Sequence, residues 1–337
     1  MNSTDPQRIL VTGGAGYIGS VVTAQLISAG YQVVVLDDLS TGYADAVHPA
    51  AELIVDDAAN AGQVLASGIG TVLHFAARSL VGESVAEPST YWHGNISTSL
   101  RLIEACRAEG VRRLVFSSTA AVYGTPLTEI IGEDHPTMPI NPYGASKLAV
   151  DHMLAAEAVA YGLGAVSLRY FNVAGAYTGL GERHEPETHL IPNLLKAASG
   201  GGAPAKLFGT DYPTQDGTAV RDYIHVADLA RAHLLALEQV EPGRHQVFNL
   251  GTGRGSSVAE VIAAVERVTG RRLPVERHRR RPGDPARLVA SNAKARAGLG
   301  WAPQHSLDDM ICGALATAER ESARRISAPD ATPARSV

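Results

Sequence analysis

Residues 8–19 read Arg8-Ile9-Leu10-Val11-Thr12-Gly13-Gly14-Ala15-Gly16-Tyr17-Ile18-Gly19, an apolar strand followed by a glycine-rich turn and the start of a helix. Without side chains, Gly13, Gly14 and Gly16 let the backbone turn tightly and approach a pyrophosphate, while Gly19 lets the helix pack close to the strand. The free N–H groups and the helix dipole at this end favour an anion. Because the motif follows a strand and opens a helix, it predicts a dinucleotide-binding domain.

An acidic residue ends the next strand. The apolar segment 32–36 leads into Asp37, about 20 residues after the glycine turn, which is the spacing of a ribose-binding carboxylate. A carboxylate there accepts hydrogen bonds from an adenosine ribose hydroxyl and repels a 2′-phosphate. No arginine lies within three residues of Asp37 on either side. The sequence therefore predicts NAD, not NADP, as the cofactor.

Strand-like and helix-like segments alternate through the first half of the chain. Apolar strand patterns cover residues 8–12, 32–36, 71–75, 113–117 and 165–169, and helical patterns cover residues 17–29, 91–108 and 143–161. Such alternation predicts an α/β fold, a Rossmann-type doubly wound parallel sheet with helices on both faces.

The pattern loosens after about Phe171, and 337 residues suit one large α/β domain with a smaller partner. We predict that residues 1–175 form the NAD-binding domain and that residues 219–240, roughly, return to it. The smaller C-terminal α/β domain, which binds substrate, comprises residues 176–218 and 241–320. Residues 321–337 are rich in Ala, Arg, Ser and Pro and are expected to form a flexible tail.

Composition narrows the class of protein. Hydrophobic residues make up 45% and charged residues 19% of the chain, as in ordinary enzymes with a full core. The net charge of -5 argues against nucleic-acid or anionic-membrane partners, and no segment has the roughly 18 apolar residues of a membrane span. Two cysteines form neither a disulfide framework nor a metal motif, and the N-terminus lacks signal-peptide features. We expect a cytoplasmic protein.

Tyr143 and Lys147 lie four residues apart and therefore share one face of the predicted helix 143–161. A tyrosine has a pKa of about 10, but a nearby ammonium and a positively charged nicotinamide both favour its phenolate. The pair predicts a general acid/base for proton transfer coupled to hydride transfer at a carbinol carbon. Thr119, after strand 113–117, is expected to hydrogen-bond the reacting oxygen and relay its proton, whereas Ser117 and Ser118 fit strand-end caps better.

These residues make the chain resemble the extended short-chain dehydrogenase/reductases, and among them the UDP-glucose 4-epimerase family. The resemblance runs from about Arg8 to Trp301. It rests on Gly13 to Ser20 and on His74-Phe75-Ala76-Ala77, Val81-Gly82-Glu83-Ser84, Arg169-Tyr170-Phe171-Asn172, Asp211-Tyr212-Pro213-Thr214, Asp216-Gly217-Thr218 and Val220-Arg221-Asp222-Tyr223-Ile224-His225-Val226.

The resemblance implies a reaction without net redox that interconverts UDP-galactose and UDP-glucose. The tyrosine takes the proton of the sugar 4-hydroxyl, carbon 4 gives a hydride to tightly held NAD, and the 4-keto sugar turns about its link to UDP before re-reduction. The implied NAD contacts are Gly13, Gly16, Tyr17, Ile18, Gly19, Asp37, Asp57, Phe75, Ala76, Ala77, Asn95, Ser117, Tyr143, Lys147 and Tyr170. The implied contacts with the UDP-hexose are Thr119, Asn172, Leu190, Arg221, Arg281, Asp284 and Leu288. Ser79 departs from the pattern, because several relatives carry lysine there.

Leu288 stands at the family position whose size limits the room for a 2-acetamido group. Some relatives carry tyrosine there, whereas this chain carries a shorter residue. The resemblance thus implies that UDP-N-acetylglucosamine and UDP-N-acetylgalactosamine are also substrates.

Three rival functions share this fold. A nucleotide-sugar 4,6-dehydratase needs an Asp-Glu pair directly after the threonine, and a UDP-glucuronate decarboxylase needs a carboxylate or hydroxyl there. Ala120 and Ala121 supply neither. A non-catalytic NAD-sensing regulator typically lacks the Tyr/Lys pair. All three are therefore disfavoured.

The resemblance also implies a homodimer, in which helices 91–108 and 143–161 would form a four-helix interface. Apolar stripes on these helices are equally required for packing on the sheet, so both explanations stay open. His184, His189 and His278 show no metal-ligand pattern, and we predict no metal.

Overall fold

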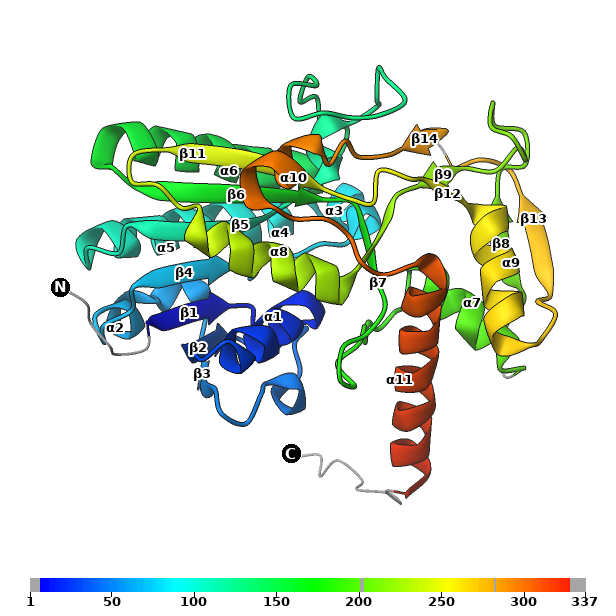
Figure 1. Cartoon of the computed structure of the whole chain (residues 1–337), viewed down its shortest axis with the longest axis horizontal. Coiled ribbons are helices and arrows are strands. Elements are labelled where there is room, and N and C mark those ends of the chain that lie inside the picture. The colour runs from blue at the N-terminus through cyan, green and yellow to red at the C-terminus, as the bar shows by residue number, and fades with distance from the viewer. Residues whose placement is uncertain (1–6, 201–202, 282, 328–337) are drawn as a thin grey trace.

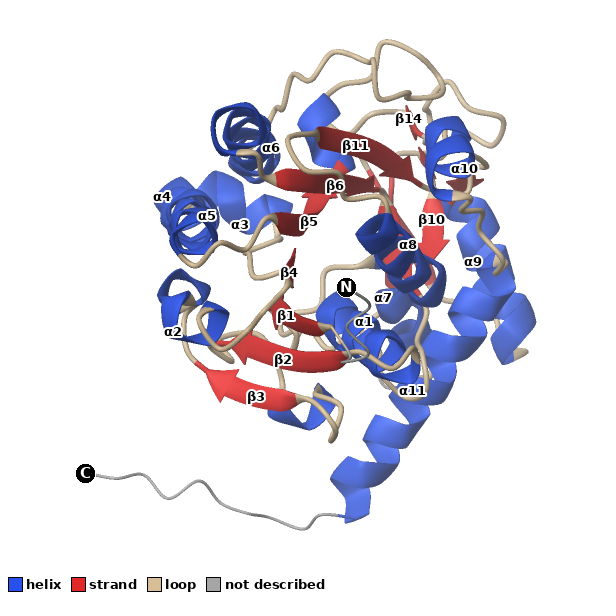
Figure 2. Ribbon diagram, turned by 60° about the vertical axis from the view of Figure 1, so that its left-hand side comes forward, coloured by secondary structure: helices blue, strands red, loops and turns tan. Residues whose placement is uncertain are grey.

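The computed structural model describes residues 7–200, 203–281 and 283–327. Seven parallel strands form its central sheet, in the order β11-β6-β5-β4-β1-β2-β3 (Figures 1 and 2). Their bounds are β1 Arg8–Thr12, β2 Gln32–Asp37, β3 Glu52–Val55, β4 Thr71–His74, β5 Arg113–Thr119, β6 Gly164–Tyr170 and β11 His245–Leu250. The predicted doubly wound parallel sheet is confirmed.

Helices cover both faces of this sheet because neighbouring strand residues point to opposite sides. On one face, Ile9 and Val11 pack with α1 (Tyr17–Ser28) and α8 (Val226–Glu238). On the other face, Leu10 packs with α5 (Thr98–Ala108) and α6 (Pro142–Tyr161). Figure 2 shows these two helical layers on either side of the strands. The resulting double burial explains why the strands read as unbroken apolar runs.

The strand order reverses between β1 and β4. In open α/β sheets, ligands bind at such a reversal, outside the carboxyl ends of the strands. Thr12, Asp37, His74, Thr119 and Tyr170 are the last residues of their strands, so they meet at this one edge.

The segment 91–108 is not the single helix that its pattern predicts. It contains the end of α4 (Pro88–Tyr91), a π-helical segment η3 (Trp92–Ser97) and then α5. Single-turn π segments are frequent at functional sites, because one extra residue re-aims a side chain. Here the turn buries Asn95 against α6.

A smaller lobe stands at the carboxyl edge of the sheet, at the right in Figure 1. Its core is formed by apolar side chains of α7 (Leu190–Ala198), α9 (Val258–Thr269) and α11 (Leu307–Ser327). Its strands are β7 Asn172–Ala174, β8 Ala205–Phe208, β9 Val220–Arg221, β10 Tyr223–His225, β12 Ser256–Ser257, β13 Val275–His278 and β14 Arg287–Leu288. The remaining elements are η1 Ala44–Ala46, η2 Ala58–Asn60, α2 Gly62–Leu65, α3 Val81–Ala86, η4 Ala120–Tyr123 and α10 Ala293–Leu299.

Three details differ from the predicted organisation. Strand β11, within the segment assigned to the smaller domain, pairs with β6 in the main sheet, because it follows α8, which already packs on that sheet, after a short connection. In the returning segment, only α8 packs on the main sheet, while β10 pairs with β7. The expectation of a tail from residue 321 is wrong as far as Ser327, since α11 continues to that residue. Residues 328–337 lie outside the described residues.

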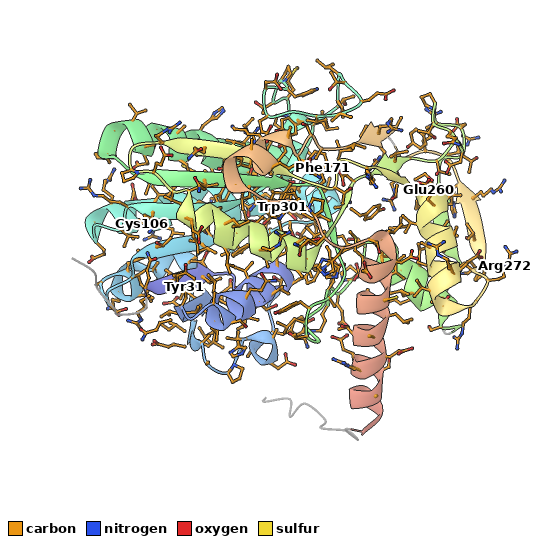
Figure 3. All side chains as sticks on the ribbon, viewed as in Figure 1. Tyr31, Cys106, Phe171, Glu260, Arg272 and Trp301 are labelled. Carbon is orange, nitrogen blue, oxygen red and sulfur yellow. The ribbon has the colours of Figure 1, made fainter. Side chains whose placement is uncertain are left out.

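Trp301 lies beside α8, in the segment between α10 and α11 (Figure 3). Its side chain is fully buried beside α8, and its indole N–H donates a 2.8 Å hydrogen bond to the main-chain oxygen of Asp228. The contact fixes the segment between α10 and α11 against the sheet layer. Among the described helices, none carries an apolar stretch long enough to cross a membrane.

Candidate active site

The glycine turn has the geometry that the sequence predicts. Gly13 has a φ of 72°, and a Cβ there would lie 2.5 Å from the main-chain nitrogen of Ala76. A Cβ on Gly19 would lie 2.2 Å from the main-chain oxygen of Gly13, so the helix can approach the turn only without one. A Cβ on Gly14 would instead lie 2.7 Å from the side chain of Val35, so glycine at this position allows close packing on β2.

Gly16 differs from these three residues. A Cβ there would meet just one described protein atom within 4 Å, the main-chain oxygen of Gly13 at 3.4 Å, and its φ of -78° suits any residue. The protein itself therefore does not require glycine at this position. The open space lies at the N-terminus of α1, where N–H groups favour an anion, so the turn fits the pyrophosphate of a dinucleotide.

Asp37 ends β2 beside this turn. One carboxylate oxygen accepts a 2.9 Å hydrogen bond from the N–H of Ala15, and the other accepts one of 2.9 Å from the N–H of Leu39. Burial raises the pKa of Asp37, and these two N–H groups oppose that rise. Each carboxylate oxygen has a second lone pair, so the orientation leaves acceptor capacity for a ribose hydroxyl.

The other predicted cofactor contacts surround the same edge. Tyr17 and Ile18 open α1, and Phe75 follows β4 with a main-chain N–H that donates to Thr12 at 2.9 Å. Ala76 donates to the same oxygen, and Ala77 follows it. Asp57 lies further out, exposed, and caps η2 by accepting a 2.8 Å hydrogen bond from Ala59.

The side-chain amide of Asn95 forms hydrogen bonds with other residues of the protein. Its Oδ1 accepts from the main-chain N–H of Arg78 at 2.8 Å, and its Nδ2 donates to the Arg78 oxygen at 3.1 Å and to Ser146 Oγ at 2.9 Å. Both amide protons are thus used, and the side chain is buried. Within the described chain, Asn95 anchors the loop after β4 to α6, whereas Ser79 is exposed.

Tyr143 and Lys147 lie in the first turns of α6. This helix begins where sequence predicts, because Asn141 caps it by accepting the N–H of Gly144 at 2.8 Å and Pro142 occupies its first position. Lys147 is buried, its Nζ donates a 2.8 Å hydrogen bond to the main-chain oxygen of Ser117, and it lies 4.8 Å from the centre of the Phe116 ring. The lysine therefore ties α6 to the end of β5.

The electrostatics of this pair depend on burial. Burial raises the pKa of Tyr143, while a hydrogen bond with Thr119 lowers it. Burial also lowers the pKa of Lys147 to about 7, against the opposing effect of Asp151. Burial thus favours the protonated form of the tyrosine. That a positively charged nicotinamide helps to activate it stays a prediction.

Thr119 and Ser117 have different surroundings. Thr119 ends β5 opposite Tyr170, hydrogen-bonds Tyr143 and accepts the N–H of Ala121 at 3.2 Å, so it also caps η4. Ser117 Oγ hydrogen-bonds the hydroxyl of Tyr170. The predicted residues Thr119, Ser117 and Tyr170 thus come together around the Tyr/Lys pair.

Sequence reasoning missed a buried polar network behind this site. His74 Nδ1 lies 2.7 Å from Thr12 Oγ1, and its Nε2 lies 2.8 Å from Ser99 Oγ. Burial, with a smaller effect of Lys147, lowers the pKa of His74 to about 3, so the ring stays neutral. The histidine couples the first strand to α5 directly beneath the site. The sequence gives this histidine a place in the family block His74-Phe75-Ala76-Ala77 but does not indicate its polar contacts.

The predicted substrate contacts gather on the smaller lobe. Strands β9 and β14 pair in parallel and place Arg221 beside Leu288. Arg221 forms a salt bridge with Asp284, and its other terminal nitrogen donates to the main-chain oxygen of Val220 at 2.8 Å. Leu288 packs against the cluster that includes Phe171.

Three further predicted residues lie on other segments of the lobe, and Thr119 lies at the end of β5. Asn172 opens β7 and its N–H donates to the main-chain oxygen of Asp222 at 2.9 Å. Leu190 is the first residue of α7. Arg281 is exposed, with its guanidinium carbon 4.1 Å from the centre of the Phe208 ring.

Comparison with known proteins agrees with this geometry. Residues 9–251 match the NAD dependent epimerase/dehydratase family. The UDP-glucose 4-epimerase of Corynebacterium glutamicum is 54% identical over 301 residues, which cover 89% of this chain and 92% of that protein. The crystal structure of UDP-glucose 4-epimerase from Brucella ovis in complex with NAD aligns with a TM-score of 0.88 and 44% identity, over 92% of this chain and 98% of that one.

A second structure carries a nucleotide as well. UDP-glucose 4-epimerase from Bifidobacterium longum, in complex with NAD+ and UDP, aligns with a TM-score of 0.89 and 37% identity, over 94% of this chain and 99% of that one. The glycine turn, the acid after β2 and the Tyr/Lys pair define an NAD-dependent enzyme of the Rossmann type. The chain belongs to the NAD dependent epimerase/dehydratase family, and its curated relatives within it are UDP-glucose 4-epimerases.

Proposed function

We propose that this chain is an isomerase that interconverts UDP-galactose and UDP-glucose by inverting carbon 4 of the hexose, with NAD as cofactor. The observation that carries the proposal is the convergence of Tyr143, Thr119 and Lys147 at the carboxyl edge of the sheet, next to the glycine turn. Ala120 and Ala121 occupy η4 directly after Thr119, so the elimination and decarboxylation alternatives have no acid or hydroxyl beside the threonine.

Each group has a role in the proton transfer. The Tyr143 hydroxyl, hydrogen-bonded to Thr119, takes the proton of the sugar 4-hydroxyl and later returns it. NAD held at the glycine turn and by Asp37 would supply the redox chemistry at carbon 4. Lys147, held by the main-chain oxygen of Ser117, favours the phenolate when it is protonated.

Inversion requires a firmly held nucleotide and a loosely held sugar, because the 4-keto sugar must turn between the two hydride transfers. We propose that the smaller lobe anchors UDP through Asn172, Leu190, Arg221, Arg281 and Asp284. The planar guanidinium of Arg221 suits a diphosphate, and its partner Asp284 fixes its orientation. The sugar then faces Tyr143, with Leu288 at the border of its pocket.

We propose that N-acetylated UDP-hexoses are further substrates. Leu288 is half-buried against an apolar cluster on the lobe that anchors UDP, and its side chain is shorter than tyrosine. The difference leaves room beside carbon 2 of the sugar.

We also propose a homodimer formed through α5 and α6, which lie together on one face of the molecule (Figure 2). Both helices bury one apolar stripe against the sheet, yet Leu100 on α5 and Val159 on α6 are exposed. Packing on the sheet does not require these outward residues, so they favour an intermolecular contact. A cytoplasmic location is supported by the two free cysteines, Cys106 and Cys312.

The function is tested by incubating the purified protein with UDP-galactose, without added NAD, and following the sugar signals by NMR. We expect UDP-glucose to form. The Tyr143→Phe variant should react about 10²–10⁴-fold more slowly than wild type and should still release NAD on denaturation. Unchanged UDP-galactose, also after NAD is added to wild-type protein, would contradict the proposal.

A further inference from the structure

The loop between β7 and α7 brings four metal-ligating side chains together. They are Glu182, His184, Glu187 and His189, and one candidate ligand atom of each lies within 4.8 Å of all the others. The spacing of the histidines matches no metal-binding motif, so the sequence predicts no metal. His278 indeed lies elsewhere, stacked on Phe208, but the path of the loop adds two glutamates to the other two histidines.

The distances between the candidate ligand atoms are close to those of a metal site. His189 Nδ1 lies 2.8 Å from Glu182 Oε1 and 2.9 Å from Glu187 Oε1. His184 Nδ1 lies 3.1 Å from the same Glu182 oxygen. Ligand atoms of a tetrahedral site with metal–ligand distances of about 2.0 Å stand about 3.3 Å apart. Small shifts of side chains would therefore reach the required geometry.

The imidazole of His184 points into the same cluster. Its Nδ1 is buried and lies 3.1 Å from Glu182 Oε1. A metal ion between the four side chains would bind this buried nitrogen in place of its contact with Glu182.

The loop around the ligands is well anchored. Asn193 Nδ2, on α7, donates to the main-chain oxygens of His189 at 2.9 Å and Glu187 at 3.3 Å. Glu187 also accepts the main-chain N–H of His189 at 2.7 Å. Such outer contacts orient the ligands of metal sites. The carboxylates are nearly buried, whereas 42% of the His189 side chain is exposed, which leaves a route for an ion.

The donor set selects the class of ion. Imidazoles that bind a metal ion are neutral, so the charge of -2 on the two carboxylates would balance a divalent cation. Imidazole nitrogen favours zinc and its neighbours among the transition metals, whereas calcium and magnesium prefer oxygen alone. We propose that Glu182, His184, Glu187 and His189 bind one divalent transition-metal ion of the zinc class.

The site would be structural, because it joins the smaller lobe to the nucleotide-binding end of the sheet. Arg183, between two of the ligands, bonds Asp45 at 2.9 and 3.1 Å and lies 4.2 Å above the ring of Tyr43, in the loop after β2. The hydroxyl of Tyr17, the first residue of α1, donates a 2.6 Å hydrogen bond to the main-chain oxygen of Gly175, where this loop begins. A bound ion would fix this loop beside the glycine turn.

The test uses tag-free full-length protein, stripped with a chelator and titrated with Co²⁺ and Zn²⁺. Wild-type protein should bind one ion per chain and show the visible absorption of cobalt held by nitrogen and oxygen ligands. His189→Asn and Glu187→Gln keep the size of each side chain, and each should weaken binding by more than about 100-fold, the upper range for loss of an outer-shell partner. His278→Asn, outside the cluster, should bind like wild type.

A second measurement keeps the proposal falsifiable where a variant folds poorly. Zn²⁺ should raise the melting temperature of wild type and of His278→Asn, and should leave that of folded His189→Asn unchanged. Absence of binding by wild type, or equal affinity of wild type and the two cluster variants, would show that the cluster is an ion-paired loop without a metal. Either result would overturn the proposal.

Discussion

Lys147 Nζ donates a 2.8 Å hydrogen bond to the main-chain oxygen of Ser117. This single contact fixes the first turns of α6 to the end of β5, and it thereby sets Tyr143 beside Thr119. Lys147 and Ser117 are 30 residues apart along the chain. The catalytic geometry therefore depends on how α6 packs on the sheet as much as on the Tyr-x-x-x-Lys spacing.

Burial of Lys147 predicts a pH dependence of stability. Its pKa in the folded protein is lowered to about 7, from an ordinary value of about 10.4, so between these values only the unfolded chain binds the proton. This group therefore does not destabilise the folded protein above the unfolded pKa. As the pH falls from that value to about 7, it lowers the free energy of unfolding. In urea unfolding, wild type should gain about 1.4 kcal/mol per pH unit relative to Lys147→Met between pH 8 and pH 10. Parallel pH profiles of the two proteins would contradict the lowered pKa.

Burial of His74 predicts that stability also depends on pH in the acidic range. Its pKa in the folded protein is lowered to about 3, from an ordinary value of about 6.5. Between these two values the unfolded chain binds a proton at this residue and the folded chain does not. Stability should fall as the pH drops from about 6.5 towards 3, and His74→Asn should show a shallower fall. Denaturant unfolding at pH 6.5, 5.5 and 4.5 measures both slopes. Equal slopes would mean that His74 accepts a proton in the folded state.

Gly16 and Gly19 form a matched pair of tests. Gly19→Ala forces a Cβ to within 2.2 Å of the Gly13 oxygen, so it should lower the free energy of unfolding by about 1–3 kcal/mol or more. Gly16→Ala meets no such obstacle and should leave stability within about 1 kcal/mol of wild type. It should nevertheless weaken NAD binding at least tenfold, because the methyl group enters the space assigned to the pyrophosphate. Titration of stripped protein with NAD checks this, and unaltered affinity in Gly16→Ala would show that the pyrophosphate lies elsewhere.

The Leu288→Tyr variant tests whether the size of this side chain decides which UDP-hexoses are substrates. The larger ring on β14 should remove turnover of UDP-N-acetylglucosamine, while turnover of UDP-galactose stays within about tenfold of wild type, the usual range for an apolar pocket change. Leu288→Met conserves volume and serves as the control. Parallel NMR assays of both substrates give the comparison. No turnover of N-acetylated substrates by wild type would refute the proposed breadth.

The sequence by itself determined the nucleotide-binding end of this protein. Arg8–Thr12, the glycine turn, Asp37 and the Tyr143/Lys147 pair were all predicted from local pattern, because strand, turn, helix face and cap depend on residues close in the chain. Features that depend on contacts between distant segments were not predicted, because local pattern does not contain them. The sequence could not reveal the π-helical turn that buries Asn95, since its polar partners, Arg78 and Ser146, lie on other elements.

Only the tertiary structure decided the rest. The addition of β11 to the main sheet, the salt bridge between Arg221 and Asp284, and the lowered pKa of Lys147 all come from contacts between distant segments. The cluster at Glu182 and His189 was invisible for a different reason: its residues are close in sequence, but a loop has no fixed period, so its path and the directions of its side chains follow from the packing around it.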